Sequence, residues 1–240
     1  MKEKLSGNVA IDGPAGAGKS TAARLLAQKL GYLYIDTGAM YRALTWKALK
    51  RGINVFAEKQ LVALAEETNI YLESTTGGIL KVYCDGEEVT KAIRQENVSC
   101  HVSAVARVPE VRRRLVELQR KMAASNRVVM DGRDIGTNVL PEAPYKFFLT
   151  ASLAERARRR YQELLAAGQP AALEKIKEEI HKRDVQDSLR EVDPLQPAPD
   201  AVIIDTTNLR IEEVVDKMLS IIYERHNFGT GSATNSGLSV

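Results

Sequence analysis

The chain has 240 residues, and its 34 lysines and arginines stand against 31 aspartates and glutamates, which leaves a net charge of +3. This excess is too small to indicate a protein that binds nucleic acid through its net charge. No run of 18 apolar residues occurs, which excludes a membrane-spanning helix. The N-terminal segment reaches a glycine-rich stretch before an apolar secretion signal can form. We therefore expect a cytoplasmic protein that binds neither nucleic acid nor a membrane.

The first predicted elements are a strand at 8–12, a glycine-rich loop and a helix. Gly13, Gly18, Lys19 and Ser20 match the pattern G-x-x-x-x-G-K-[ST], in the strand-loop-helix context in which that pattern binds phosphate. Backbone N–H groups of residues 14–20 would surround the β-phosphate, Lys19 would reach the β and γ oxygens, and the Ser20 hydroxyl would hold Mg²⁺. The sequence thus predicts a nucleoside triphosphate site made of Gly13, Pro14, Ala15, Gly16, Ala17, Gly18, Lys19, Ser20 and Thr21.

The rest of the chain alternates between strands and helices. Further strands are predicted at 32–36, 127–134, 145–151 and 201–207, and helices at 38–52, 57–68, 108–124, 153–168, 172–190 and 212–225. Short alternating runs at 70–74 and 79–90, with glycine and Asp-Gly turns, indicate an inserted antiparallel meander. This order predicts an α/β fold with a mostly parallel sheet and helices on both faces. Residues 227–240 lack apolar periodicity, which predicts a flexible tail.

The class of phosphate-loop protein follows from what accompanies the loop. No NKxD element for reading a guanine base occurs, and the strands near 131 and 205 each end in a lone aspartate rather than the adjacent acids of a motor. Arginines instead gather in 111–115, 155–161 and 182–190. Because a guanidinium binds phosphate through paired donors, this composition favours a small-molecule kinase.

Four motifs in this order resemble the bacterial cytidylate kinase family: IDGPAGAGKST (11–21), DTGAMYRA (36–43), MDGRDIGT (130–137) and KRDVQDSLR (182–190). The resemblance extends from about residue 9 to about residue 223. It implies the P-loop nucleoside monophosphate kinase fold, with a five-stranded parallel core in one domain at 1–226. It also implies an inserted monophosphate-binding lobe at about 66–105 and a helical lid at about 153–190.

The same resemblance implies an enzyme that passes a phosphate from ATP, with Mg²⁺, directly to CMP or dCMP, and a monomer as the family's usual state. A carboxylate beside a cationic donor suits the amino group and ring nitrogen of cytosine. Asp134 and Arg112 match the family's pair for this purpose, with Ser103 adding a hydroxyl, and Arg133 would hold the acceptor phosphate. The other implied acceptor contacts are Thr37, Tyr41 and Arg42 at the sugar and phosphate, Arg183 and Asp187 at the ribose hydroxyls, and Arg190 as support of the closed site.

Several of these roles have alternatives. Arg113 and Arg114 compete with Arg112, and Asp134 could instead cap the turn that follows it. Asp36 suits either a helix N-cap or a magnesium partner. In the implied lid, Arg156, Arg159 and Arg160 share one helix face. We take Arg159 as the arginine that joins Lys19 and Arg133 in catalysis.

Two other functions compete with CMP phosphorylation. The first is a kinase of another nucleoside monophosphate, such as UMP, dUMP or AMP, which would differ in how residues 112 and 134 read the base. The second is an RNA-binding module with ATP as a switch, which would show a steep salt dependence. The chain has no aromatic-rich RNA-binding motif, so the kinase is favoured.

Overall fold

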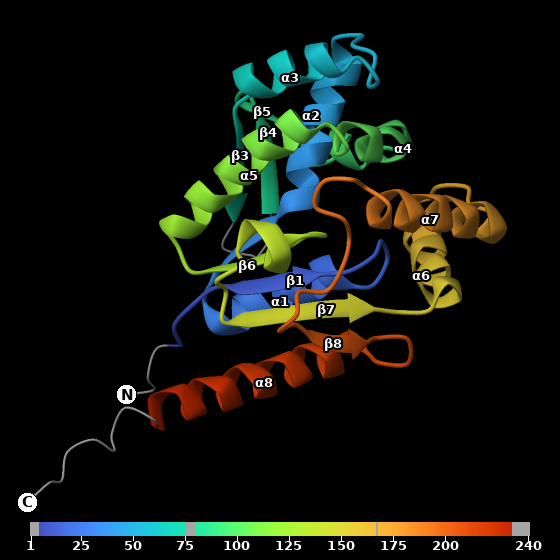
Figure 1. Cartoon of the computed structure of the whole chain (residues 1–240). Helices are drawn as coiled ribbons and strands as arrows, with labels where there is room; N and C mark the ends of the chain where they lie inside the picture. The colour runs from blue at the N-terminus through green and yellow to red at the C-terminus, as the bar shows by residue number, and fades with distance from the viewer. Residues whose placement is uncertain (1–4, 75–79, 167, 232–240) are drawn as a thin grey trace, which may run out of the picture.

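The computed structural model describes residues 5–74, 80–166 and 168–231 of the chain (Figure 1). Within them, a parallel sheet has the strand order β2-β6-β1-β7-β8, with strands Leu33–Asp36, Val128–Asp131, Val9–Asp12, Tyr145–Thr150 and Val202–Asp205. A separate antiparallel sheet contains β3 (Ile70–Ser74), β4 (Leu80–Cys84) and β5 (Glu87–Glu88). The predicted parallel five-stranded sheet and the predicted antiparallel insertion are both confirmed.

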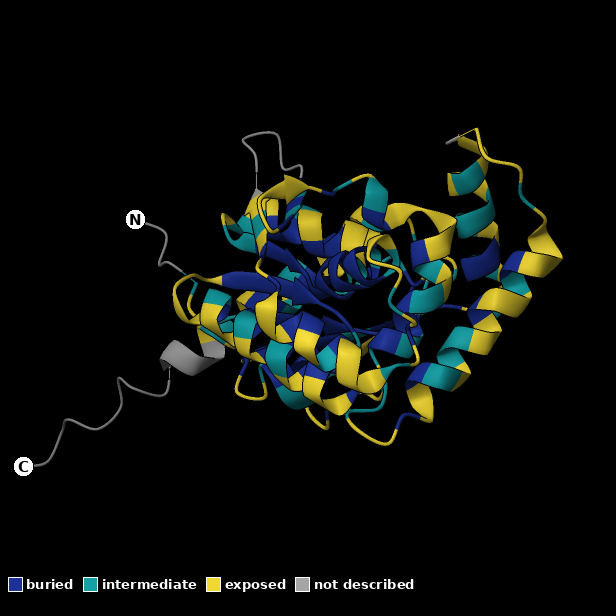
Figure 2. Cartoon of the chain, turned by 90° about the horizontal axis from the view of Figure 1, so that it is seen from above, coloured by how far each residue is buried: buried dark blue, intermediate teal, exposed yellow. Residues whose placement is uncertain are grey.

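Helices cover both faces of the parallel sheet. Helices α1 (Lys19–Leu30) and α8 (Ile211–Gly231) pack on one face with Val9 and Ile11, whereas Ala10 packs on the other with α5 (Pro109–Ala124) and the short π-helix η2 (Ile135–Val139). Every residue of β1 is buried, as expected for a central strand covered on both sides. Figure 2 shows these strands at the buried centre, with exposed residues on the outer sides of the helices.

A lobe packs around the antiparallel sheet, and Figure 1 shows it on the β6 side of the parallel sheet, opposite β8. Its further elements are α2 (Thr37–Lys50), α3 (Glu58–Glu67), η1 (Ala92–Arg94) and α4 (Glu96–Val105). One apolar cluster runs from Ala39 to Leu115, so the packed unit takes in more of the chain than the predicted 66–105. Inside it, the buried Nζ of Lys47 donates to Thr68 Oγ1 at 2.9 Å and lies 2.7 Å from Asp85 Oδ2.

Two antiparallel helices, α6 (Leu153–Ala166) and α7 (Leu173–Ser188), project beside the sheet in the region of the predicted lid (Figure 1). They share a small cluster of Ala157, Ile176 and Ile180. Because α7 also approaches α4, where Lys175 Nζ lies 3.5 Å from Glu96 Oε1, the pair of helices bridges the parallel sheet and the lobe.

The C-terminal helix differs from the prediction. Helix α8 continues to Gly231, so residues 227–231 are helical and do not belong to the predicted flexible tail. The remainder of that tail, 232–240, lies outside the described residues. Among the helices of the described part, none is long and apolar enough to cross a membrane.

The buried face of the sheet generates a stability prediction. Phe147 on β7 is fully buried between the strands, α1 and α8, so Phe147→Ala should lower the free energy of unfolding by about 3–5 kcal/mol through lost burial and a new cavity. Ile203, on the adjacent strand, is 59% exposed, and Ile203→Ala should change stability by only about 0.5 kcal/mol. Urea unfolding of both variants tests this, and equal losses would contradict the packing.

Candidate active site

The phosphate loop connects β1 to α1 through glycines whose backbone conformation disfavours any larger residue. At Gly13 (φ +143°) a Cβ would lie 2.0 Å from the carbonyl oxygen of Leu149, and Gly18 (φ +84°) caps α1 in the left-handed region. Lys19, the first residue of α1, is buried, and its Nζ donates to the Pro14 carbonyl at 2.7 Å across the loop. The loop therefore presents backbone N–H groups and one ammonium group at a helix N-terminus.

Asp131 ends β6, the strand beside β1, and it organises the edge of the site. Its Oδ2 accepts a hydrogen bond from Ser20 Oγ and its Oδ1 accepts one from Tyr34 OH, each at 2.9 Å. Its carbonyl accepts a bond from Thr37 Oγ1 at 2.7 Å. Burial, and then the nearby carboxylate of Asp36, raise the pKa of Asp131 above its usual value.

Asp131 is a site residue that the sequence analysis missed. In the sequence, Asp131 stands alone at the end of its strand, which argues only against the adjacent acids of a motor protein. The signal that could have revealed it is its place at the end of a buried strand, since the carboxyl ends of parallel strands meet at one edge of the sheet. Asp36, at the end of β2, caps α2, and its Oδ1 accepts a bond from Ala39 N at 2.9 Å, as one of its two predicted roles requires.

Positive charges converge beside the loop. Arg133 Nε donates to Asp187 Oδ2 of α7 at 2.8 Å, whereas Arg183 has a buried Nε with no hydrogen-bond partner among the described residues. Burial, and then the charges of Arg133 and Arg42, lower the pKa of Arg183 to about 10. Burial followed by the charge of Arg133 lowers the pKa of Lys19. Such a group of repelling cations is what a bound polyanion would stabilise.

The predicted pair for reading the base is assembled. Arg112 is buried, and its Nη2 donates to Asp134 Oδ2 at 2.5 Å while its Cζ lies 5.8 Å from the centre of the Tyr41 ring. Arg190 Nη2 lies 3.7 Å from the other oxygen of Asp134. Among the three consecutive arginines of α5, it is Arg112 that contacts Asp134. Ser103 is buried on α4, and no hydrogen bond joins it to this pair in the described part of the chain.

The arginines of α6 differ in their contacts. Arg156 Nη1 donates to the loop carbonyl of Ala15 at 3.1 Å and to Asp184 Oδ2 of α7 at 2.6 Å. Arg159 also lies beside the loop, where its Nη2 donates to the Thr206 carbonyl at 2.6 Å. Arg160 is paired instead with Glu163 at 3.1 Å. Two of the three predicted lid arginines are therefore next to the phosphate loop.

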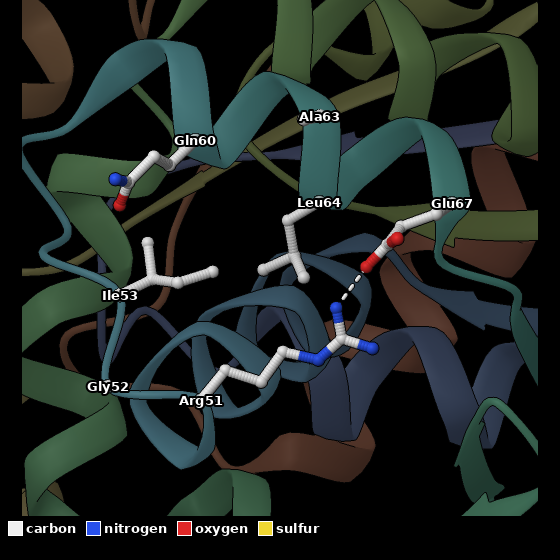
Figure 3. Close-up of a pocket in the computed structure, with 7 residues that line it drawn as sticks. All are labelled: Arg51, Gly52, Ile53, Gln60, Ala63, Leu64 and Glu67. Carbon is white, nitrogen blue, oxygen red and sulfur yellow. Dashed lines mark hydrogen bonds and ion pairs between the residues drawn. The ribbon is translucent and has the colours of Figure 1, made fainter.

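A hollow of about 390 Å³ lies elsewhere, on the outer side of the lobe between α2 and α3 (Figure 3). Its lining consists of Arg51, Gly52, Ile53, Gln60, Ala63, Leu64 and Glu67. The two charged residues of this lining, Arg51 and Glu67, form an ion pair with each other (Figure 3). The hollow therefore lacks the unneutralised positive charge that a phosphate site needs.

A glycine loop between a buried parallel strand and a helix, with arginines from several elements around it, defines a P-loop kinase. The cytidylate kinase family model matches residues 9–224. A cytidylate kinase of Desulfitobacterium hafniense (strain Y51) is 52% identical, over 95% of this chain and 97% of that protein. Those of Geobacillus kaustophilus (strain HTA426) and Geobacillus thermodenitrificans (strain NG80-2) are 54% and 55% identical, over 94% and 90% of this chain and 99% and 96% of theirs. The chain belongs to the cytidylate kinase family and is a phosphotransferase.

The lowered pKa of Lys19 generates a second prediction. The folded state disfavours the lysine's charge relative to the unfolded chain, where the pKa keeps its usual value of 10.5. The charge therefore costs stability at low pH, and the cost fades as pH rises through the interval between the lowered value and 10.5. Lys19→Met should thus unfold at a higher urea concentration than the wild type at pH 6, by a margin that shrinks at pH 9.

The matched control is Lys29→Met. Lys29 is on the same helix but exposed, and it pairs with Asp216 at 2.9 Å. Its replacement should shift the free energy of unfolding by less than about 0.5 kcal/mol at both pH values. A Lys19→Met protein that is less stable than the wild type at pH 6 would show that burial and Arg133 do not disfavour the lysine's charge.

Proposed function

We propose that the protein transfers the γ-phosphoryl group of ATP to CMP, and also to dCMP, by direct in-line attack. The observation that carries this proposal is the position of the repelling cations. Lys19 belongs to the phosphate loop, and Arg133 directly precedes Asp134 of the base-reading pair. Arg183 is on α7, and its side chain lies near that of Arg133. The positive charge therefore lies where the phosphates of two nucleotides would meet.

ATP with Mg²⁺ is the proposed donor complex. Mg²⁺ prefers oxygen ligands and is usually held by one or two side chains together with phosphate oxygens and water. Ser20 Oγ and Asp131 Oδ2, 2.9 Å apart beside the loop, fit that requirement and would hold the ion. When bound, Mg²⁺ neutralises part of the charge on the transferring phosphates. Arg156 and Arg159 would bind the donor from α6, as their position beside the loop supports.

CMP or dCMP is the proposed acceptor. The exocyclic amino group of cytosine would donate to Asp134, and Arg112 would donate to the neighbouring ring nitrogen or carbonyl. Uracil would turn a carbonyl toward the carboxylate, which leaves both acceptors unpaired. Ser103 remains a predicted further contact. The proposed sugar and phosphate contacts are Thr37, Tyr41, Arg42, Arg133, Arg183, Asp187 and Arg190.

Transfer would need no covalent intermediate and no strong base, because the attacking group is already a phosphate anion. Positioning and charge stabilisation would supply the rate enhancement, with Lys19 and Arg133 nearest the moving phosphoryl group. The lobe and the α6–α7 lid would exclude water, which otherwise hydrolyses ATP. We further propose that the protein acts as a monomer in the cytoplasm.

Loss of the loop cation tests the donor site. Lys19→Ala should abolish CMP-dependent ADP release, because no other residue of the loop carries a positive charge to the β and γ oxygens. Lys29→Ala, on the same helix but paired with Asp216 at the surface, should retain wild-type turnover. Near-normal turnover of Lys19→Ala would show that the donor binds elsewhere.

Loss of the carboxylate that reads the base tests the acceptor site and separates it from other monophosphate kinases. Asp134→Ala should lower kcat/KM for CMP by about ten-fold or more while leaving that for UMP much less affected, because the lost hydrogen bond is specific to cytosine. The ratio of the two kcat/KM values is the readout, since it does not depend on the fraction of folded protein. Equal losses on CMP and UMP would contradict the base-reading role.

A further inference from the structure

A single carboxylate joins the phosphate loop to the turn that carries the acceptor residues. Asp12 is the last residue of β1, directly precedes Gly13 and is only 3% exposed. Its Oδ1 accepts a hydrogen bond from the N–H of Ile135 at 2.8 Å, and its Oδ2 accepts one from the N–H of Gly136 at 2.7 Å. Both oxygens of this buried group therefore bind the first two backbone donors of η2.

The segment held in this way begins immediately after Arg133 and Asp134. The pairing of β1 with β6 reaches Ile11 and Asp131, and the N–H of Gly132 still donates to the Ile11 carbonyl at 3.0 Å. Beyond Gly132 the chain leaves the sheet, and the Asp12 side chain provides the next contacts from β1 to it. Asp134 makes no capping hydrogen bond to η2, because its carboxylate faces Arg112.

We propose that Asp12 is a positioning residue that holds the turn carrying Arg133 and Asp134 in a fixed place relative to the phosphate loop. It touches neither nucleotide and acts through the backbone of Ile135 and Gly136. In effect, one side chain sets the distance between the donor and acceptor halves of the site. This inference rests on the proposed function, because it gives a role to the turn only if Arg133 and Asp134 bind the acceptor.

The chemistry of the contact explains why a carboxylate stands here. Two acceptor oxygens on a short side chain satisfy two adjacent donors, whereas an asparagine would turn its own NH₂ group toward one of them and leave it unpaired. Burial raises the pKa of Asp12 to about 7, against the opposing effects of the two backbone hydrogen bonds and of Lys19, and with a further raising effect from Asp134. Burying a charge is costly, so its presence beside the reacting groups favours a role in placing them.

The test is the Asp12→Asn variant, measured by steady-state kinetics with CMP, UMP and ATP varied in turn. An unpaired donor should shift the turn, so KM for CMP should rise about ten-fold and the CMP-to-UMP ratio of kcat/KM should fall. KM for ATP should stay within about two-fold, because the loop glycines and Lys19 are unchanged. A general loss of folded enzyme would lower the apparent kcat alone and would move neither KM nor the ratio.

The matched control is Asp205→Asn. Asp205 ends β8 as Asp12 ends β1, but it is exposed, and its Oδ1 accepts bonds from the N–H and hydroxyl of its neighbour Thr207. This variant should keep the wild-type KM for CMP and the wild-type KM for ATP. The positioning role would be overturned if Asp12→Asn kept the wild-type KM for CMP and the wild-type CMP-to-UMP ratio. It would also be overturned if only the KM for ATP rose.

Gly136→Ala provides a second test that leaves the carboxylate in place, should Asp12→Asn fail to fold. Its methyl group would lie 3.2 Å from Lys146 Cδ and 3.4 Å from Asp12 Oδ2, so it would crowd the contact between Asp12 and the turn. KM for CMP should rise in the same direction by roughly two- to five-fold, and an unchanged value would overturn the inference. A wild-type enzyme with no CMP-dependent ADP release would instead contradict the proposed function itself.

Discussion

Mutual repulsion among buried cations is the constraint on which the site depends. Burial, and then the charge of Arg133, lower the pKa of both Lys19 and Arg183. Against its burial, the pKa of Arg133 is raised by the carboxylate of Asp187, whereas the carboxylates near Lys19 and Arg183 only partly offset the lowering. A fold that holds such a group together sacrifices stability for function, as active sites commonly do.

The fold meets this constraint by bringing aspartates to one edge of a rigid sheet. The adjacent strands β1 and β6 end in Asp12 and Asp131, and the polar turns that follow place the lysine and arginines just beyond them. The helices α6 and α7 complete the arrangement, since Arg156 reaches the loop carbonyl of Ala15 and Arg133 reaches Asp187. The turns after β1 and β6 therefore meet the α6–α7 pair through charged hydrogen bonds.

The sequence revealed those features whose signal is local. Glycine spacing located the phosphate loop, alternation predicted the parallel sheet, and an Asp-Gly turn marked the antiparallel insertion. It did not reveal α4, because this short helix of Asn, Ser, Cys and His has no capping residue and its buried valines carry the only periodicity. Nor could spacing show that Asp12 binds η2, 123 and 124 residues further along, because that contact exists only after the strands have paired.

The most direct measurement is a coupled assay of ADP release by the wild-type protein, with ATP as the donor and CMP, dCMP, UMP, dUMP and AMP as acceptors in turn. If the cations bind the phosphates of two nucleotides and the Arg112–Asp134 pair reads cytosine, turnover will be fast with CMP and dCMP and slow with the other three. ADP release that no acceptor stimulates, or that UMP or AMP stimulates as strongly as CMP, would contradict that function.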